Sequence, residues 1–282
     1  MIKVGIIGSG TMGMGIAHTF AIYGYKTLMI DLQESLLKTA LKNIKINIDR
    51  QVKKGLFSLN QSKAALSNLD ISISYTGLQD YDLVIEAATE NQEIKLNIFK
   101  QLDMICRLDT ILATNTSSIS IDKLSSVTNR PEKVIGMHFM NPVPIMKLIE
   151  IVNGKNTSIE TSKFILDISK SIDKTPVECN DSPGFVSNRI LMPMINEAIF
   201  CLYEDVGSPE AIDTIMKLGM AHPMGPLALA DLIGLDVCLN ILNVLYKDFN
   251  NEKYAPCKLL IEKVNSGELG RKSGKGFYEY NK

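Results

Sequence analysis

The sequence has little of several features that would point to particular functions. Its five cysteines are scattered and no two form a C-x-x-C pair, so we expect reduced, mostly buried thiols and no metal or redox centre. The formal net charge is only −1, which gives no case for nucleic acid or a membrane as a partner. The long apolar region Leu227–Leu245 is interrupted by Asp231, Asp236 and two asparagines, so no stretch predicts a membrane span.

The chain also lacks internal repeats and low-complexity segments. An apolar strand is predicted to begin at Ile2, which leaves no room for a signal or transit peptide, so we expect a cytoplasmic protein. The length of 282 residues allows one large domain or two smaller ones.

A glycine-rich segment, Gly8-Ser9-Gly10-Thr11-Met12-Gly13, follows the first apolar run and precedes a predicted helix. A G-x-G-x-x-G between strand and helix lets the backbone approach a pyrophosphate, which the free N–H groups at the helix start stabilise. Asp31 closes the next apolar run, where an acid can bind the ribose 2′-hydroxyl. Together these features predict a dinucleotide site, with NAD favoured over NADP because the carboxylate would repel a 2′-phosphate.

The first two thirds of the chain alternate apolar strands with amphipathic helices, which predicts βαβ units and a mainly parallel sheet. The strands are expected at Val4–Ile7, Lys26–Ile30, Ile71–Tyr75, Leu83–Ala87, Ile111–Thr114, Val134–His138, Lys147–Val152 and Val177–Cys179. The intervening helices are expected to start at Thr11, Leu32, Asn91, Ile121 and near Ser158. The segments Leu32–Gly55 and Ser58–Asn68 predict a helical pair inserted between the second and third strands.

The character of the sequence changes after Asn180-Asp181-Ser182-Pro183-Gly184. Strand signals end there, and helices are predicted at Ile190–Tyr203, Pro209–Leu218 and Ala228–Tyr246. We therefore predict an α/β fold: a Rossmann-type, doubly wound domain over residues 1–183, and an all-α domain over residues 184–282.

His138 is a candidate catalytic residue because it ends a predicted strand, and ligands of open α/β sheets bind at strand carboxyl ends. Only a Pro-containing loop separates this strand from the next, so at least one of the two is expected to run against the rest. Their pairing could set Glu150 against the imidazole and fix its tautomer. The alternative is a structural histidine and a solvated glutamate, and the residues alone do not decide between them.

Other polar groups each allow two interpretations. Thr114-Asn115-Thr116-Ser117-Ser118 follows a strand end and can be a ligand-binding cluster, an N-cap run for the helix near Ile121, or both. The long helix ends with Arg50, Lys53 and Lys54. These cations either form a solvated face that complements the helix dipole or bind the phosphate of a ligand. His18 is expected to be structural, and His222 structural or interfacial.

These residues and motifs together resemble the short-chain 3-hydroxyacyl-CoA dehydrogenases, in particular the bacterial 3-hydroxybutyryl-CoA dehydrogenases, over nearly the whole chain. Besides the glycine motif, the resemblance rests on six segments. They are Glu86–Asn91, Asn115–Ser118, His138–Pro142, Asp181–Arg189, His222–Pro226 and Gly270–Tyr278.

The resemblance implies roles for individual residues. His138 corresponds to the catalytic base, Glu150 to its orienting partner, and Ser117 and Asn188 to residues that hydrogen-bond the acyl group. Residues that resemble those lining the NAD site are Asp31, Glu90, Lys95, Asn141 and Lys272. Lys54, and with less support Asn47, correspond to contacts with CoA. The helical domain is implied to form a homodimer.

The expected activity is reversible oxidation of a (S)-3-hydroxyacyl-CoA to a 3-ketoacyl-CoA with NAD. Two alternatives stay open. One is a β-hydroxyacid dehydrogenase of the 6-phosphogluconate or 3-hydroxyisobutyrate type, against which Ser187-Asn188-Arg189 counts because it lacks the catalytic lysine of that type. The other is a catalytically silent NAD-binding protein, which would need none of His138, Glu150, Ser117 and Asn188.

Overall fold

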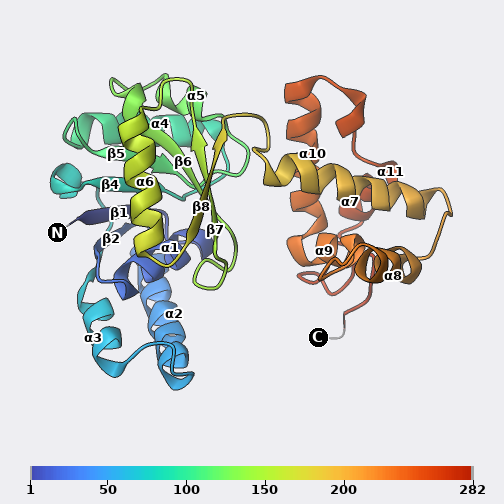
Figure 1. Cartoon of the computed structure of the whole chain (residues 1–282), viewed down its shortest axis with the longest axis horizontal. Coiled ribbons are helices and arrows are strands. Elements are labelled where there is room, and N and C mark those ends of the chain that lie inside the picture. Colours follow the sequence, from blue (N-terminus) through green and yellow to red (C-terminus); the bar gives the residue numbers. More distant parts are fainter. Residues whose placement is uncertain (1, 281–282) are drawn as a thin grey trace. The chain divides into compact units, whose positions relative to one another are not determined.

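The computed structural model describes residues 2–280 and divides the chain into two compact units, Met1–Asp181 and Ser182–Lys282. The division falls inside the segment Asn180–Gly184, where the composition of the sequence changes. Figure 1 labels the helices and strands of both units.

The first unit is built on one sheet, which within residues 2–280 has eight strands in the order β3-β2-β1-β4-β5-β6-β7-β8. Strands β1 to β6 are parallel, β7 runs antiparallel to β6, and β8 is parallel to β7. The mainly parallel sheet and the predicted reversal are therefore confirmed. The strands are Lys3–Ile7 (β1), Lys26–Ile30 (β2), Leu69–Ser72 (β3), Leu83–Glu86 (β4), Ile111–Thr114 (β5), Val134–Phe139 (β6), Leu148–Asn153 (β7) and Thr175–Asn180 (β8).

Helices cover both faces of this sheet (Figure 1). They are Thr11–Ile22 (α1), Glu34–Lys53 (α2), Leu59–Ser67 (α3), Gln92–Ile105 (α4), Ile121–Ser125 (α5) and Ile159–Ser171 (α6), with the short 3₁₀ turns Leu78–Asp80 (η1) and Pro131–Lys133 (η2). The amphipathic helix α2 buries Leu37, Ala40, Ile44 and Ile48, so its apolar stripe joins the core and the predicted helical pair is confirmed.

Strand β3 is displaced from its prediction. It covers Leu69–Ser72 rather than Ile71–Tyr75, because Leu69 is the residue paired with Thr27 of β2. The Ser72 hydroxyl donates to the Ser74 carbonyl at 2.8 Å, and the Ser74 N–H donates back to the hydroxyl at 3.0 Å. Such local side-chain bonds turn the chain and end the strand.

The second unit is helical, as predicted, and contains Ser187–Tyr203 (α7), Pro209–Gly219 (α8), Pro226–Ile233 (α9), Leu235–Phe249 (α10), the 3₁₀ turn Glu252–Tyr254 (η3) and Lys258–Asn265 (α11). The single helix predicted over Ala228–Tyr246 is wrong: α9 and α10 meet at a bend of 98° at Gly234, whose φ is +105°. Helix α7 begins three residues before the predicted Ile190, and α11 was not predicted.

No single helix in residues 2–280 is long and apolar enough to cross a membrane. Helices α9 and α10 meet the length and composition of a span only as a sharply bent pair. Their apolar residues form the core of the helical unit, where Leu227, Leu235, Leu242 and Leu245 are fully buried.

Two buried carboxylates tie the C-terminal segment to α9. Asp231 accepts hydrogen bonds from the N–H groups of Phe277 and Tyr278, both at 3.0 Å, and from the Tyr280 hydroxyl at 2.9 Å. Asp213 accepts from the Tyr278 hydroxyl at 2.9 Å and from two N–H groups in the first turn of α9. The segment is thus fixed by hydrogen bonds rather than by regular secondary structure.

Candidate active site

The three motif glycines serve three different purposes. Gly8 has φ of +100°, and a Cβ there would lie 2.6 Å from the Ala87 carbonyl oxygen. A Cβ at Gly13 would lie 2.0 Å from the Gly8 carbonyl oxygen, so the third glycine allows α1 to pack against the loop. A Cβ at Gly10 would meet no atom within 4 Å, which leaves the backbone open to a ligand. This division of roles fits a pyrophosphate site.

The start of α1 can receive an anion. Gly10 is its N-cap residue and makes no side-chain cap hydrogen bond, and Thr11, Met12 and Gly13 form the first turn. The N–H groups of such a turn carry the positive end of the helix dipole. The loop therefore fits the phosphates of a dinucleotide.

Asp31 lies at the carboxyl end of β2 and is held by the glycine loop. The Ser9 N–H and hydroxyl both donate to Asp31 Oδ2, at 2.8 and 2.7 Å. A pocket of about 620 Å³ opens beside it, lined by Gly10, Asp31, Tyr75 and Gln101 among others. The carboxylate is thus fixed at the rim of a pocket large enough for the adenosine end of NAD.

The strand reversal brings His138 and Glu150 together. The antiparallel register of β6 and β7 pairs the two residues directly, and His138 Nδ1 lies 2.8 Å from Glu150 Oε2. The side chains are 10% and 6% exposed. A carboxylate on Nδ1 orients the ring, stabilises its cation and assigns proton exchange to Nε2.

The segment after His138 packs against α1, the helix that follows the glycine motif. A Cβ added to Gly15 of α1 would lie 2.9 Å from Cβ of Val143, so the loop after β6 packs closely on α1. The Phe139 N–H donates to Asn115 Oδ1 at 2.9 Å, which joins the ends of β5 and β6. Asn141, expected to line the NAD site, lies exposed in this loop, before a cis peptide bond to Pro142.

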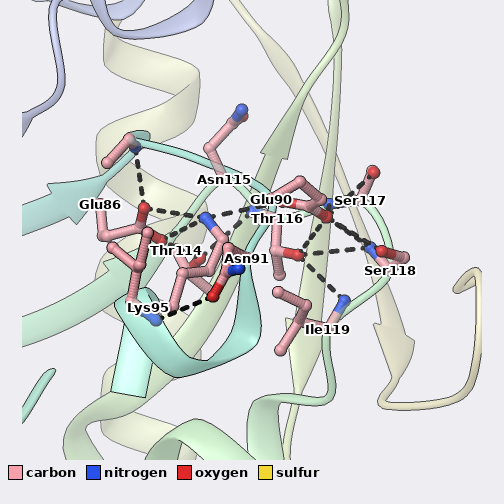
Figure 2. A network of polar contacts seen from close by, with 12 residues as sticks. Glu86, Glu90, Asn91, Lys95, Thr114, Asn115, Thr116, Ser117, Ser118 and Ile119 are labelled. Carbon is pink, nitrogen blue, oxygen red and sulfur yellow. Dashed lines mark hydrogen bonds and ion pairs between the residues drawn. The ribbon is translucent and has the colours of Figure 1, made fainter. Parts of the chain in front are cut away.

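The polar cluster after β5 is organised around Glu90 (Figure 2). One oxygen of Glu90, Oε1, accepts from the Thr116 hydroxyl at 2.6 Å and from the N–H groups of Ser117 and Ser118 at 2.9 and 3.2 Å. The hydroxyls of these serines also lie within hydrogen-bond distance, at 3.2 and 3.0 Å. The N-cap of α5 is Ser120, outside the cluster, so the cluster does not cap that helix.

Glu90 is held in its ionised form. Partial removal from water raises its pKa, but the Lys95 cation and the donors from Thr116, Ser117 and Ser118 outweigh this, and the net pKa is lowered. An ionised carboxylate only accepts hydrogen bonds. Glu90 therefore fixes the backbone of the loop that carries Ser117.

Behind Glu90, Lys95, which the resemblance implies at the NAD site, forms a buried ion pair with Glu86. Lys95 Nζ lies 2.8 and 2.6 Å from the two carboxylate oxygens of Glu86, and 3.6 Å from Glu90 Oε2. The Lys95 and Glu86 side chains are 2% and 0% exposed. A carboxylate that closes an apolar strand was the available signal, since a buried charge requires a partner.

The remaining predicted site residues lie elsewhere. Asn188 is in the first turn of α7, where its N–H donates to the Gly184 carbonyl at 3.1 Å. Lys272 Nζ lies 2.5 Å from Asp236 Oδ1. Both residues belong to the helical unit.

The end of α2 carries the predicted CoA contacts. Lys54 is the exposed C-cap residue of α2, and Arg50 and Lys53 occupy its last turn. Asn47 lies seven residues before Lys54, so the two are on the same side of the helix, two turns apart. The cations complement the helix dipole and leave their charged groups accessible to an anion.

The other two histidines lie on α1 and in the helical unit. His18 is buried on α1, and its Nε2 lies 2.9 Å from Gln51 Oε1 of α2. His222 is half-buried in the loop between α8 and α9. No cluster of three or more His, Cys, Asp or Glu side chains in residues 2–280 could hold a metal ion.

Comparison with known proteins places this geometry in a family. Residues 3–182 match the NAD binding domain of 3-hydroxyacyl-CoA dehydrogenase, and residues 184–280 match its C-terminal domain. The probable 3-hydroxybutyryl-CoA dehydrogenase of Bacillus subtilis is 50% identical over 278 residues, covering 99% of this chain and 97% of that protein. The 3-hydroxybutyryl-CoA dehydrogenase of Clostridioides difficile is 50% identical over 280 residues, covering 99% and 100%.

A solved structure agrees with the sequence relatives. The crystal structure of (S)-3-hydroxybutyryl-CoA dehydrogenase from Ralstonia eutropha superposes with a TM-score of 0.97 at 48% identity, covering 99% of both chains. At this sequence identity the similarity indicates membership of the same family, and not only the same fold. The chain belongs to the 3-hydroxyacyl-CoA dehydrogenase family.

Proposed function

We propose that this protein catalyses the reversible, NAD-dependent oxidation of (S)-3-hydroxyacyl-CoA to 3-ketoacyl-CoA, with 3-hydroxybutyryl-CoA and acetoacetyl-CoA as the reacting pair. The observation that carries the proposal is the contact of His138 with Glu150 at the carboxyl end of β6, the strand that leads into a loop packed against α1. Family membership and the names of the relatives support the substrate class.

The proposed chemistry needs one proton acceptor beside a hydride acceptor. NAD, held at the glycine loop, would supply the acceptor for the hydride on C3 of the substrate. His138 Nε2 accepts the hydroxyl proton, and Glu150 stabilises the imidazolium that results. In the reverse direction the same imidazolium protonates the oxygen on C3. Ser117 and Asn188 are assigned to hold the reacting oxygen or the thioester carbonyl in line.

The geometry of the glycine loop supports the assignment of the cofactor residues. Gly8 to Gly13 are assigned to the pyrophosphate and Asp31 to the ribose hydroxyls of the adenosine end. Preference for NAD over NADP rests on Asp31, because a 2′-phosphate would meet its charge at short range. Glu90, Lys95, Asn141 and Lys272 are assigned to the nicotinamide end, where Lys95 would act mainly through Glu90 because its side chain is buried.

Three further assignments concern the rest of the molecule. Lys54, with Asn47, is proposed to contact the CoA portion. Residues 1–183 would form the NAD-binding domain and 184–282 the domain for the substrate cleft and dimerisation. Exposed apolar side chains on α7 and α8, including Ile190, Ile215 and Leu218, support a homodimer. We place this dimer in the cytoplasm.

The test of the function is a spectrophotometric assay of the purified protein. Loss of NADH absorbance on addition of acetoacetyl-CoA, with formation of the (S)-alcohol, is the expected result. Turnover of 3-hydroxyisobutyrate or 6-phosphogluconate without turnover of acetoacetyl-CoA would contradict it. Binding of NADH with no turnover of any of these compounds would point to a silent NAD-binding protein.

A further inference from the structure

The buried Glu86 makes hydrogen bonds at the edge of the polar cluster, with its carboxylate and with its backbone carbonyl. Its Oε1 accepts from the Ala88 N–H at 2.8 Å and from Lys95, and its Oε2 accepts from Lys95 and from the Thr114 hydroxyl at 2.8 Å. Its backbone carbonyl accepts from the Asn115 N–H at 2.7 Å. Glu86 therefore ties the end of β4 to the end of β5 and to α4 (Figure 2).

Glu86 also determines where the Lys95 cation lies. The ammonium is within 2.8 Å of both Glu86 oxygens but 3.6 Å from Glu90. A buried ammonium cannot remain unpaired, so without the charge of Glu86 it would move onto Glu90 or lose its proton. Either change alters the charge that Glu90 experiences.

Glu90 in turn fixes the loop that carries Ser117. Its Oε1 already accepts from Thr116, Ser117 and Ser118, and Lys95 faces the other oxygen. If the ammonium moved toward Glu90, the carboxylate would turn and these hydrogen bonds would weaken. The loop would then lose its fixed position beside the reacting groups.

We infer that Glu86 is a positioning residue of this enzyme: through Lys95 and Glu90 it fixes the loop at 116–118 and so the alignment of the substrate. This inference rests on the proposed function for its kinetic consequence, and on the contacts alone for its structural consequence. Glu86 itself is fully buried, so it is assigned a positioning role and not a catalytic one.

The kinetic test compares Glu86→Gln with Asp103→Asn. Asp103 forms another buried ion pair of the same unit, with Arg130 Nε at 2.7 Å, and bonds to nothing in the polar cluster. Both variants should lose stability, but only Glu86→Gln should lower kcat/KM for acetoacetyl-CoA, by about 10²-fold, because misplacement of positioning groups has effects of that size. Equal kcat/KM values for Glu86→Gln and Asp103→Asn would overturn the inference.

A double-mutant cycle tests the route through Glu90. If Glu86 acts through Glu90, the double variant Glu86→Gln/Glu90→Gln should be no slower than Glu90→Gln alone, since the second change removes what the first disturbs. If the loss of rate in the double variant equals the product of the losses in the two single variants, Glu86 acts by another route and the inference is overturned.

Amide hydrogen exchange provides a readout that does not depend on activity. In Glu86→Gln, peptides covering residues 115–119 should exchange about tenfold faster than in wild type, while peptides of β1 change only with global stability. Unchanged protection at 115–119 would overturn the inference even if the enzyme is active. Faster exchange in a protein that does not reduce acetoacetyl-CoA would instead contradict the proposed function alone.

A second variant tests the inference in case Glu86→Gln does not fold. Glu86→Gln/Lys95→Met removes both charges of the buried pair, which is usually far less destabilising than removing one. Its stability should return toward wild type, and protection at 115–119 should recover, because no ammonium is left to move onto Glu90 and turn its carboxylate. Exchange at 115–119 as fast as in Glu86→Gln would show that Glu86 does not act through Lys95 and would overturn the inference.

Discussion

Nδ1 of His138 lies 2.8 Å from Oε2 of Glu150, across the only antiparallel pair in the sheet that residues 2–280 form. The pairing is a consequence of topology. A short Pro-containing loop cannot make a parallel crossover, so β7 returns beside β6 and sets its glutamate opposite the histidine. The backbone register, rather than a flexible loop, therefore orients the imidazole.

Removal of the Glu150 charge should slow the chemical step. Glu150→Gln keeps a side chain of similar shape but no longer stabilises the imidazolium, so kcat should fall about 10²-fold or more. Steady-state rates with acetoacetyl-CoA and NADH measure this. Glu178→Gln on β8, which bonds to Ser162 outside the site, serves as the control. Similar kcat values for the two variants would exclude a catalytic role for Glu150.

Asp31 should control the choice between NADH and NADPH. In Asp31→Asn the repulsion of a 2′-phosphate is gone and the ribose loses a charged acceptor. We expect the ratio of kcat/KM values for NADH over NADPH to fall about tenfold or more. Asp70→Asn on β3, whose partner is Lys26, should leave the ratio unchanged. A ratio in Asp31→Asn equal to that of wild type would show that other residues select the cofactor.

Lys54 should contribute to the binding of CoA but not of NADH. Lys54→Ala removes an exposed cation, and a surface charge pair of about 1 kcal/mol corresponds to a rise in KM for acetoacetyl-CoA of about fivefold. The rise should shrink at high salt because salt screens exposed charges. Lys38→Ala, on the same helix but paired with Glu34, is the matched control. If the KM values of the two variants rise equally, the contact is not specific.

His18 should make the protein less stable in mild acid. Burial lowers its pKa from the ordinary 6.5, and this effect outweighs the opposing one of the Gln51 hydrogen bond. The folded protein thus binds the proton less readily than the unfolded chain. The stabilising contribution is complete above pH 6.5 and is lost as the pH falls toward the lowered pKa.

Urea unfolding of wild type and His18→Gln measures this effect. The free energy of unfolding of wild type should fall more steeply between about pH 7.5 and about pH 5.5 than that of the variant, because the variant has no ionisable side chain at position 18. Equal slopes in the two proteins would mean that His18 does not contribute to the acid sensitivity.

Much of the fold could be predicted because it depends on local patterns. The alternation of strands and helices, the glycine loop and the reversal after β6 all leave a signal in neighbouring residues. The bend at Gly234 leaves a weaker one, because the apolar residues continue through the glycine on both sides. Its φ of +105° is the conformation that ends α9, and only packing of the helical unit selects it.

The candidate site was predictable in part, for the same reason. His138 and Glu150 follow from the register of two adjacent strands. The bonds from Glu90 to the serine loop join segments 26 to 28 residues apart, and no local pattern specifies them. A single glutamate at a strand end, such as Glu86, looks like any other in the sequence until its burial is known.

The central claim, that His138 exchanges the proton of the reacting hydroxyl, is tested most directly by single-turnover oxidation of NADH with acetoacetyl-CoA in His138→Ala. The rate should fall by about 10²–10⁴-fold, the usual contribution of a positioned acid–base residue, while NADH binding measured by its fluorescence stays as in wild type. A near-normal rate in the folded variant would contradict the mechanism.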